Sequence, residues 1–376
     1  MSLPLSGQRI GLLTASASRL GGGVYEAVVK QAAMIRALGG EALIFALLDA
    51  HSHEDAINFA PSPVAALPVK GPRQIGYAPG LLKALLDARL DSLHLHGIWM
   101  YPSRAGCLWA RHTGKPYFIS PHGMLDPWIT ARGRWKKALA RAGYERANWR
   151  AARGLHALTR SEANDIAAES GRNDSLIIPN PAPALVPAQD AASRPPVVAF
   201  IGRVHPKKNF LALIEGWQRA NLPEGARLVL AGWGDAADVA TLEGAVAAAG
   251  PDVSFVGPIY GPAKAALLAE ARFIALPSLS EGLPMAILES WSAGTPTLMS
   301  RHCHLDEGFE AGAAIDCGED PASVARALEQ GLALDGPAWL AMSKAAQGLA
   351  AGAFGADTIA RRWAEVYLGA PEGSLA

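Results

Sequence analysis

Short apolar runs alternate with amphipathic stretches from the start of the chain. Ile10–Thr14 is an apolar run, a glycine-rich turn follows at Gly21–Gly23, and about Val24–Leu38 has apolar residues at helical spacing. A second apolar run, Ala42–Leu47, completes a strand–helix–strand unit, which favours a parallel sheet covered by helices. Further strands are expected at Ser92–His96, Tyr117–Ser120, Gly154–Leu158 and Ser175–Ile178, and a basic helix at about Ala131–Ala152.

A proline-rich stretch interrupts this alternation. Six prolines lie between Pro179 and Pro196, which is typical of a connection between domains. The alternation then restarts, with strands expected at Val197–Ile201, Arg227–Ala231, Val253–Val256, Phe273–Pro277 and Thr297–Ser300. Helices are expected at about Phe210–Ala220, Ala236–Ala249, Ala263–Ala271 and Met285–Ala293, and a last one at about Thr358–Leu368.

The two series predict an α/β chain of two doubly wound, Rossmann-like domains that face one another across a cleft. The length of 376 residues fits two domains better than one. We expect an N-terminal domain over 1–183, a linker over 184–195 and a C-terminal domain over 196–354. Ligands of such sheets bind beyond the carboxyl ends of the strands.

Charge and cysteine content narrow the function classes. Lys plus Arg and Asp plus Glu number 34 each, so no overall electrostatic footprint for nucleic acid exists. The three cysteines, Cys107, Cys303 and Cys317, are far apart, which disfavours a disulfide framework or a cysteine zinc site. No signal peptide or membrane-spanning run is recognised. We expect a cytoplasmic protein that is at most peripheral to a membrane.

The string Ser278–Pro284 links an expected buried strand to an expected helix. Free N–H groups at a helix start form an anion site, and Gly282 allows close approach of a ligand. Glu281 could accept hydrogen bonds from two vicinal hydroxyls, and Glu289 could reach a second diol such as a ribose. A phosphate between two diols describes a sugar nucleotide. The alternative is that Glu281 caps the helix and Glu289 is a surface carboxylate.

Two cations flank another turn at the end of an expected strand. Arg203 and Lys208, in Gly202–Asn209, could neutralise a diphosphate as it leaves, a task often assigned to a metal. The alternative is a solvated turn.

Two features of the N-terminal half give weaker evidence for a binding site. Gly21–Gly23 does not fit the G-x-G-x-x-G spacing, and either a flexible turn or a phosphate contact explains it. His122, in Ser120–Gly123, could bind the transferred sugar or position the acceptor, or be structural. The pairs His94 with His96 and His302 with His304 have no convincing further ligands, so no metal is expected.

Taken together, these motifs resemble the retaining glycosyltransferases of family 4, which have the GT-B fold. The resemblance covers essentially the whole chain. Leu95–Trp99, Ser120–Trp128 and Glu307–Phe309 resemble a bacterial branch involved in surface polysaccharide assembly.

The resemblance implies roles for individual residues. Glu281 would contact the donor sugar, Glu289 the ribose, and Arg203 and Lys208 the diphosphate, while His122 would lie beside the anomeric carbon. Further donor contacts would come from Gly22, Gly23, Gly282, Leu283 and Pro284, and acceptor-side contacts from His96, Trp99, Lys136 and Lys137. It also implies a nucleotide-sugar co-substrate, no cofactor or divalent metal, and retention by front-face attack. A C-terminal helix over 355–376, with Trp363 and Tyr367, would cross back to the N-terminal domain.

Two positions depart from the family pattern. Asn209 stands where the family usually has glycine, and Pro179–Ala182 replaces the usual Pro-Asn-Gly-Val.

The expected basic helix suggests a partner of its own. Its cations and Trp135 could touch an anionic membrane surface or a polyprenyl-diphosphate acceptor, or could form a solvated face.

Other functions remain to be weighed. A hydrolysing sugar-nucleotide epimerase of the same fold needs further acid and base carboxylates, which the sequence does not place. A non-catalytic sugar-binding protein and a nicotinamide dehydrogenase are disfavoured by the missing export signal and by the glycine spacing. GDP-mannose and UDP-hexoses stay open as donors, with a glycan or lipid-linked glycan as acceptor.

Overall fold

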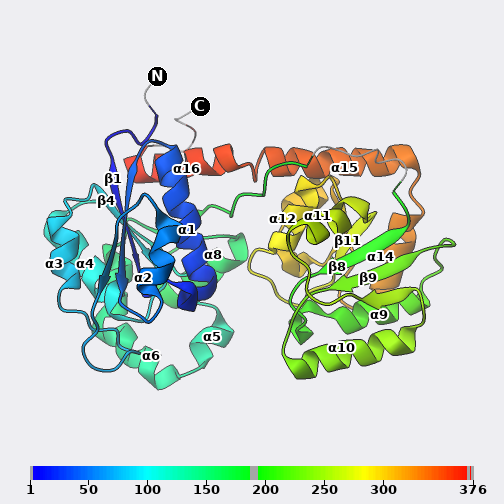
Figure 1. The fold of residues 1–376 in the computed structure, drawn as a ribbon, viewed down its shortest axis with the longest axis horizontal. Coiled ribbons are helices and arrows are strands. Elements are labelled where there is room, and N and C mark those ends of the chain that lie inside the picture. The colour runs from blue at the N-terminus through cyan, green and yellow to red at the C-terminus, as the bar shows by residue number, and fades with distance from the viewer. Residues whose placement is uncertain (1–2, 187–193, 371–372, 374–376) are drawn as a thin grey trace. The chain divides into compact units, whose positions relative to one another are not determined.

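The chain forms two compact units, each built on its own parallel sheet (Figure 1). The structure is a computed structural model and describes residues 3–186, 194–370 and 373. One unit comprises Met1–Pro179 with Ala360–Ala376, and the other Asn180–Ile359. The expected α/β fold with two doubly wound domains is therefore confirmed.

The first unit contains a seven-stranded sheet in the order β3-β2-β1-β4-β5-β6-β7. Its strands are β1 (Arg9–Thr14), β2 (Glu41–Leu47), β3 (Val64–Leu67), β4 (Ser92–His96), β5 (Tyr117–Ser120), β6 (Gly154–Ala157) and β7 (Leu176–Ile177). Its helices are α1 (Gly22–Ala37), α2 (Ser52–Asp55), α3 (Leu81–Asp87), α4 (Tyr101–Thr113), α5 (Pro127–Ala131), α6 (Arg134–Ala140), α7 (Arg146–Ala151), α8 (Arg160–Ser170) and most of α16 (Ala356–Leu368).

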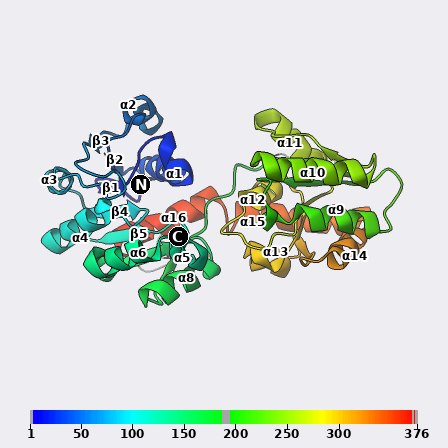
Figure 2. The same ribbon diagram turned by 90° about the horizontal axis from the view of Figure 1, so that it is seen from below.

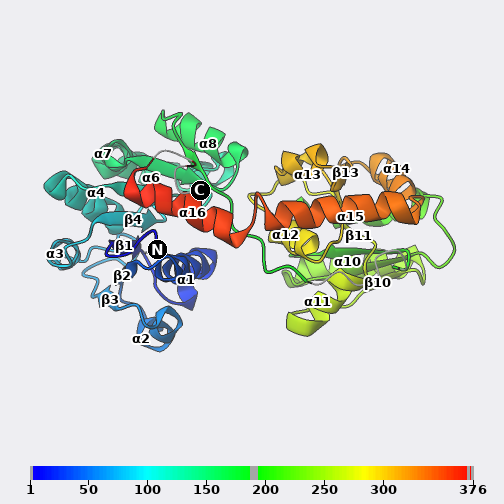
Figure 3. The same cartoon turned by 90° about the horizontal axis from the view of Figure 1, so that it is seen from above.

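The side chains of β4 divide between the two faces of this sheet. Leu93 and Leu95 pack with apolar residues of α3 and α4. His94 points to the other face, where its ring lies 5.0 Å from that of Trp363 of α16. Because neighbouring residues of a strand alternate between faces, α16 covers the face opposite α3 and α4. Figure 3 shows α16 on the same side as α1. The expected C-terminal helix thus packs on the N-terminal unit.

The second unit contains a six-stranded parallel sheet in the order β10-β9-β8-β11-β12-β13. Figure 2 shows the helices of this unit. Its strands are β8 (Val197–Ile201), β9 (Arg227–Ala231), β10 (Val253–Phe255), β11 (Phe273–Leu276), β12 (Thr297–Met299) and β13 (Ala314–Asp316). Its helices are α9 (Phe210–Arg219), α10 (Ala236–Ala249), α11 (Gly261–Glu270), α12 (Met285–Ser292), α13 (Asp306–Glu310), α14 (Pro321–Leu332) and α15 (Gly336–Ala351).

The central strand of this sheet is buried on both faces, as its continuous apolar run predicts. Val198 and Phe200 of β8 pack with residues of α9 and α14. Val197 and Ala199 pack on the other face with Leu268 of α11.

The basic helix expected over about Ala131–Ala152 is present from Arg134 to Ala151, but it begins later than expected. Gly133 has φ 64°, a left-handed conformation that cannot continue a helix, and it separates α5 from α6. A π-helical segment, Arg141–Glu145, then joins α6 to α7. Here the buried Glu145 accepts a hydrogen bond from the N–H of Trp99 at 2.6 Å. The tertiary partner of a buried carboxylate is not visible in helical periodicity.

The proline-rich stretch is attached to the second unit where the structure describes it. The N–H of Ala182 donates to the carbonyl of Phe354 at 2.8 Å, and that of Val186 to Ser292 at 3.0 Å. At the other end, the buried Arg194 donates to Ala293 at 3.0 Å. The second unit therefore begins at Asn180, before the boundary predicted at 183, and most of the predicted linker 184–195 lies outside the described residues.

Acid should destabilise the first unit over a defined range of pH. Burial lowers the pKa of His156 from 6.5 to about 4, so the unfolded chain binds this proton at higher pH than the folded chain does. The contribution of neutral His156 to the free energy of unfolding is complete above pH 6.5. It is lost as the pH falls towards 4, and the loss amounts to about 3 kcal/mol for this residue. Urea unfolding from about pH 7.5 to about pH 4.5 measures it.

The matched variant is His156→Gln. Its side-chain amide can still donate to the carbonyl of Ile178, which His156 Nε2 contacts at 2.8 Å, but it does not titrate. The variant should lose less stability than the wild type over this range. An equal loss in both proteins contradicts the assignment.

Candidate active site

The loops that follow β8 and β11 meet at the carboxyl edge of the second sheet. Lys208 Nζ lies 2.6 Å from Oε1 and 2.7 Å from Oε2 of Glu281. The hydroxyl of Ser278 donates to Oε1 at 2.5 Å, and the N–H of Leu279 donates to the carbonyl of Lys207 at 2.8 Å. The Glu281 side chain is only 8% exposed, and Lys208 supplies the opposite charge that a buried carboxylate requires.

A residue in the left-handed backbone conformation ends the turn that carries Lys208. The turn Pro206–Lys208 stops at Asn209, whose φ is 57°. Its side-chain amide donates to the carbonyls of Pro277 at 3.0 Å and Glu319 at 2.7 Å. Asparagine tolerates this conformation better than other residues with a side chain, apart from aspartate. The departure from the family glycine therefore preserves the turn.

The second glutamate of the motif has a different lysine partner. Glu289 lies on α12, and its Oε2 is 2.5 Å from Nζ of Lys264 on α11. The helix begins at Met285, with Pro284 as its N-cap residue. A Cβ added to Gly282 would meet no atom within 4 Å, so the loop before the helix is open on this side.

Arg203 points away from this ion pair. Its Nη2 lies 3.4 Å from Asp235, and its guanidinium carbon lies 5.5 Å from the centre of the Trp233 ring. Lys208 and Glu281 are thus brought together, whereas Arg203 and Glu289 each have other partners in this conformation.

In the first unit, His96 and His122 lie together at the carboxyl ends of β4 and β5. His96 Nδ1 is 3.0 Å from His122 Nε2, and the rings stack with centroids 5.3 Å apart. His122 has φ 54°, and the next N–H, of Gly123, donates to Glu162 at 2.7 Å. Burial, with a smaller effect from the charge of His156, lowers the pKa of His122 to about 3. The ring is therefore neutral at physiological pH.

The glycine turn after β1 leads directly into α1. Gly22 has φ 53°, and a Cβ added to Gly22 or Gly23 would meet no atom within 4 Å. Both glycines are exposed, so ligand access to this helix start is unobstructed by the first unit.

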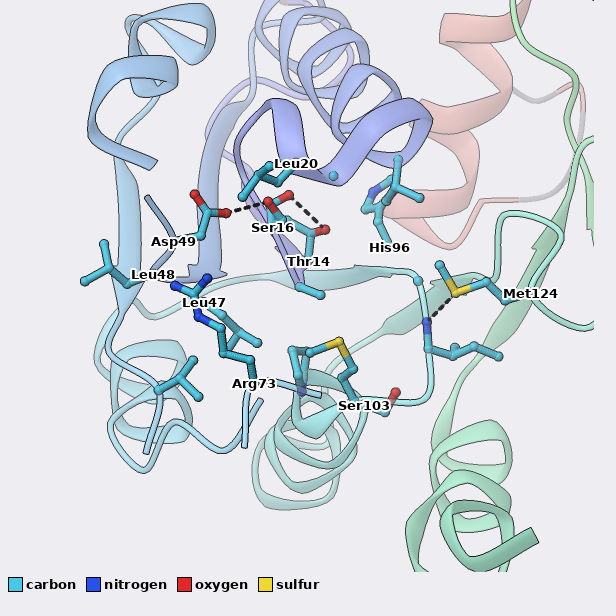
Figure 4. A pocket seen from close by; sticks show the side chains of 18 residues that line it. Thr14, Ser16, Leu20, Leu47, Leu48, Asp49, Arg73, His96, Ser103 and Met124 are labelled. Carbon is cyan, nitrogen blue, oxygen red and sulfur yellow. Dashed lines mark hydrogen bonds between the residues drawn. The ribbon is translucent and has the colours of Figure 1, made fainter. Parts of the chain in front are cut away.

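A cavity of about 330 Å³ opens beside this turn, where β1, β2 and β4 end (Figure 4). Most lining residues are apolar, with polar groups from Ser16, Asp49, Arg73, His96 and Ser103. Ser16 donates to Asp49 at 2.6 Å. Burial opposes ionisation of Asp49, but hydrogen bonds from Ser16, His51, Ser18 and Ser52 outweigh it and lower its pKa.

The remaining acceptor-side candidates lie near α6. The N–H of the Trp99 indole donates to the carbonyl of Met124 at 3.2 Å, and Lys137 Nζ lies 5.8 Å from the Trp99 ring. Lys137 also donates to the carbonyl of Ile129. Lys136 is exposed and lies 5.4 Å from the ring of Trp135.

Neither histidine pair forms a metal site in the described part of the chain. The rings of His94 and His96 pack tilted against one another with centroids 4.1 Å apart, and His302 Nε2 lies 3.2 Å from Glu319 Oε1. Across residues 3–186 and 194–370, no three His, Cys, Asp or Glu side chains are grouped so as to hold a metal ion.

Several groups at these edges were not predicted from the sequence. Ser278 had a local signal, since it precedes Glu281 by three residues. Lys264, Trp233 and the Ser16–Asp49 pair had none, because their partners come from other loops and helices.

Comparisons with known families match most of the chain in two parts, one in each unit. Residues 22–181 match the family model described as "Glycosyl transferase 4-like domain", and residues 195–333 match "Glycosyl transferases group 1". A stretch of 162 residues, 41% of this chain, is 32% identical to D-inositol 3-phosphate glycosyltransferase of Mycobacterium avium. That stretch spans 38% of the relative's length.

Solved structures resemble the fold over almost the full length. Anabaena HepE in complex with UDP has a TM-score of 0.76 at 18% identity, covering 96% of this chain and 100% of that one. The lipopolysaccharide outer core galactosyltransferase WaaB has a TM-score of 0.71 at 16% identity, covering 96% and 99%. With the two matched family models and two parallel sheets of this kind, the chain belongs to the family 4 type of glycosyltransferases with the GT-B fold.

Proposed function

We propose that this chain transfers a hexose from a nucleotide sugar, a UDP-hexose or GDP-mannose, to a glycan or lipid-linked glycan. The transfer retains the anomeric configuration, needs no divalent metal and serves the assembly of a cell-surface polysaccharide. The observation that carries the proposal is the Lys208–Glu281–Ser278 cluster at the carboxyl edge of the second sheet. The D-inositol 3-phosphate glycosyltransferase relative and the UDP complex of HepE support the substrate class.

Charge placement gives the cluster its proposed role. A departing nucleoside diphosphate gains negative charge, and Lys208 and Arg203 stabilise that charge in place of a metal. Arg203 is 47% exposed, so it can leave Asp235 to bind a phosphate. The N–H groups near Leu283 and Gly22 add phosphate contacts. Glu281 accepts hydrogen bonds from the donor sugar, Glu289 from the ribose, and His122 lies beside the anomeric carbon.

The acceptor is assigned to the first unit. The cavity at the ends of β1, β2 and β4 offers an apolar wall with Asp49 and Arg73 as polar groups. His96 lines the cavity at its β4 side. Trp99, in the loop after β4, is a further acceptor-side residue, and an acceptor hydroxyl attacks the front face of the donor sugar.

One surface favours membrane association, at the cytoplasmic face of the plasma membrane. Trp135 and Leu139, one helical turn apart on α6, are each 66% exposed. Arg134 and Lys136 on the same helix are also exposed, and these four residues are called the α6 patch. Cations beside exposed apolar side chains suit an anionic lipid surface or a polyprenyl-diphosphate acceptor held in it. The described part of the chain contains no helix with the length and apolar character of a membrane span.

Replacing the central carboxylate tests the transferase assignment. Glu281→Gln keeps the shape and the hydrogen bond from Ser278 but removes the charge, and should lower kcat/KM roughly 10²-fold. The measurement is product formation from UDP- or GDP-hexoses and a lipid-linked acceptor in the presence of EDTA. The NMR coupling constant of the product's anomeric proton reports whether the configuration is retained. Glu215→Gln, on the surface of α9, is the matched control.

Three results would contradict this part of the proposal. Unchanged turnover in Glu281→Gln removes the assigned role, and activity that requires an added divalent ion removes metal independence. Release of an epimerised free sugar without a new glycosidic bond favours the epimerase instead.

Nucleotide binding tests the role of Glu289 separately from turnover. One of UDP and GDP should raise Tm, by an amount that grows with the logarithm of the nucleotide concentration above its Kd. Glu289→Gln should weaken binding of that nucleotide roughly 10-fold, because a charged acceptor for the hydroxyls of the ribose diol is lost. Titration calorimetry with the Glu215→Gln control measures this. Equal affinity in Glu289→Gln and control would place the ribose elsewhere.

Vesicle binding tests the α6 patch. The full chain should sediment with vesicles containing phosphatidylglycerol and much less with phosphatidylcholine alone, and salt should weaken the binding. Trp135→Ser with Leu139→Ser should reduce binding at least roughly 10-fold. Ile57→Ser, which removes an equally exposed apolar side chain outside the patch, should not. Equal binding by both variants would refute this surface.

A further inference from the structure

A continuous chain of hydrogen bonds runs under the candidate site of the first unit. Tyr367 of α16 lies 2.8 Å from His94 Nδ1, and His94 Nε2 lies 2.7 Å from Ser120 Oγ. Ser120 Oγ is also 2.7 Å from His156 Nδ1, and His156 Nε2 is 2.8 Å from the carbonyl of Ile178. All four side chains are buried.

The carbonyl of Ile178, at one end of this series of hydrogen bonds, determines which atom donates and which accepts in each of them. Ile178 O can only accept, so neutral His156 carries its proton on Nε2 and accepts at Nδ1 from the Ser120 hydroxyl. Ser120 Oγ then accepts from His94 Nε2–H, which leaves His94 Nδ1 to accept from Tyr367. Burial raises the pKa of Tyr367 and lowers the pKa of His94 and His156, so the phenol keeps its proton and the rings stay neutral.

The same reasoning applies to the neighbouring pair of rings. The His96 ring packs tilted against the His94 ring, with centroids 4.1 Å apart, and His96 Nδ1 is 3.0 Å from His122 Nε2. His96 Nε2 is buried and has no hydrogen-bond partner among the described residues. An N–H without a partner is rarer in protein interiors than an acceptor without one. The proton of His96 therefore belongs on Nδ1, where it is donated to His122.

That assignment determines which ring nitrogen of His122 is available to a ligand, and whether it donates or accepts a hydrogen bond. His122 accepts at Nε2, so its own proton must be on Nδ1. The ring is presented from a left-handed backbone position, φ 54°, that Glu162 helps to hold through the N–H of Gly123. His122 Nδ1–H is then a hydrogen-bond donor rather than a general base.

We propose that His96 is a positioning residue that holds His122 as its Nδ1–H tautomer, so that His122 donates a hydrogen bond to the transferred sugar. The role in turnover rests on the proposed function, whereas the tautomer does not. Packing of His96 against His94 links this arrangement to Tyr367, so docking of α16 supports the His96 ring.

Nitrogen NMR of the full chain tests the tautomer directly. The ring nitrogens of His122, identified as the signals absent in His122→Asn, should show a protonated Nδ1 and a bare Nε2 at neutral pH. His96→Asn keeps an N–H donor near the position of Nδ1 and should preserve this pattern. His96→Leu should change it to a mixture or to Nε2–H. A protonated Nε2 in the wild type, or an unchanged pattern in His96→Leu, overturns the proposal.

Kinetics separate a positioning role from a structural one. His96→Leu should lower kcat about 10-fold with little change in KM for the nucleotide sugar, the effect of one lost hydrogen bond. His96→Asn should recover most of kcat. Equal losses in both variants with wild-type Tm overturn the positioning role. If the chain transfers no sugar, the proposed function fails while the NMR result still decides the tautomer.

Discussion

Strands that run in one direction all end at the same edge of their sheet, and this geometry determines where chemistry collects in each unit. In the second unit, the loops after β8 and β11 leave neighbouring strands at that edge, which brings Lys208 to Glu281. In the first unit, β4 and β5 are neighbours in the same way, which brings His96 to His122. Residues far apart in the chain thus become partners because sheet order makes their loops adjacent.

Both glutamates of the donor motif are paired with lysines in the structure. Glu281 is nearly buried and has Lys208 and Ser278 as partners, and Glu289 has Lys264. A carboxylate removed from water requires such compensation. Under the proposed function, the same two carboxylates bind hydroxyl groups of the donor while phosphate charge is drawn to Lys208 and Arg203. The ion pairs therefore hold the carboxylates in place before the donor arrives.

Beneath His96 and His122, the buried polar side chains of the first unit are uncharged histidines rather than ion pairs. His94 and His156 each have two hydrogen-bond partners, so neutral rings satisfy their polar atoms inside the core. The Trp363 ring packs against both rings, tilted on His94 and edge-on to His156, with centroids 5.0 and 4.7 Å away. The C-terminal helix is consequently part of the core beneath His96 and His122. A site built on such support retains its ring orientations.

The alternation of apolar runs by itself determined the two-sheet architecture, including β4, β5, β8 and β9 at their observed bounds. The continuous apolar run of β8 is what a strand buried on both faces requires. The alternation did not predict β3, β13, α3, α4, α8, α14 or α15, and it began the basic helix before Gly133, whose left-handed conformation depends on context. The Glu281/Glu289 spacing and the cationic turn were visible in sequence as donor-site candidates. Only the tertiary structure decided their partners, since Lys264 reaches Glu289 and Asp235 reaches Arg203 from other segments of the chain. Local patterns report what a residue can do, and packing decides which group it meets.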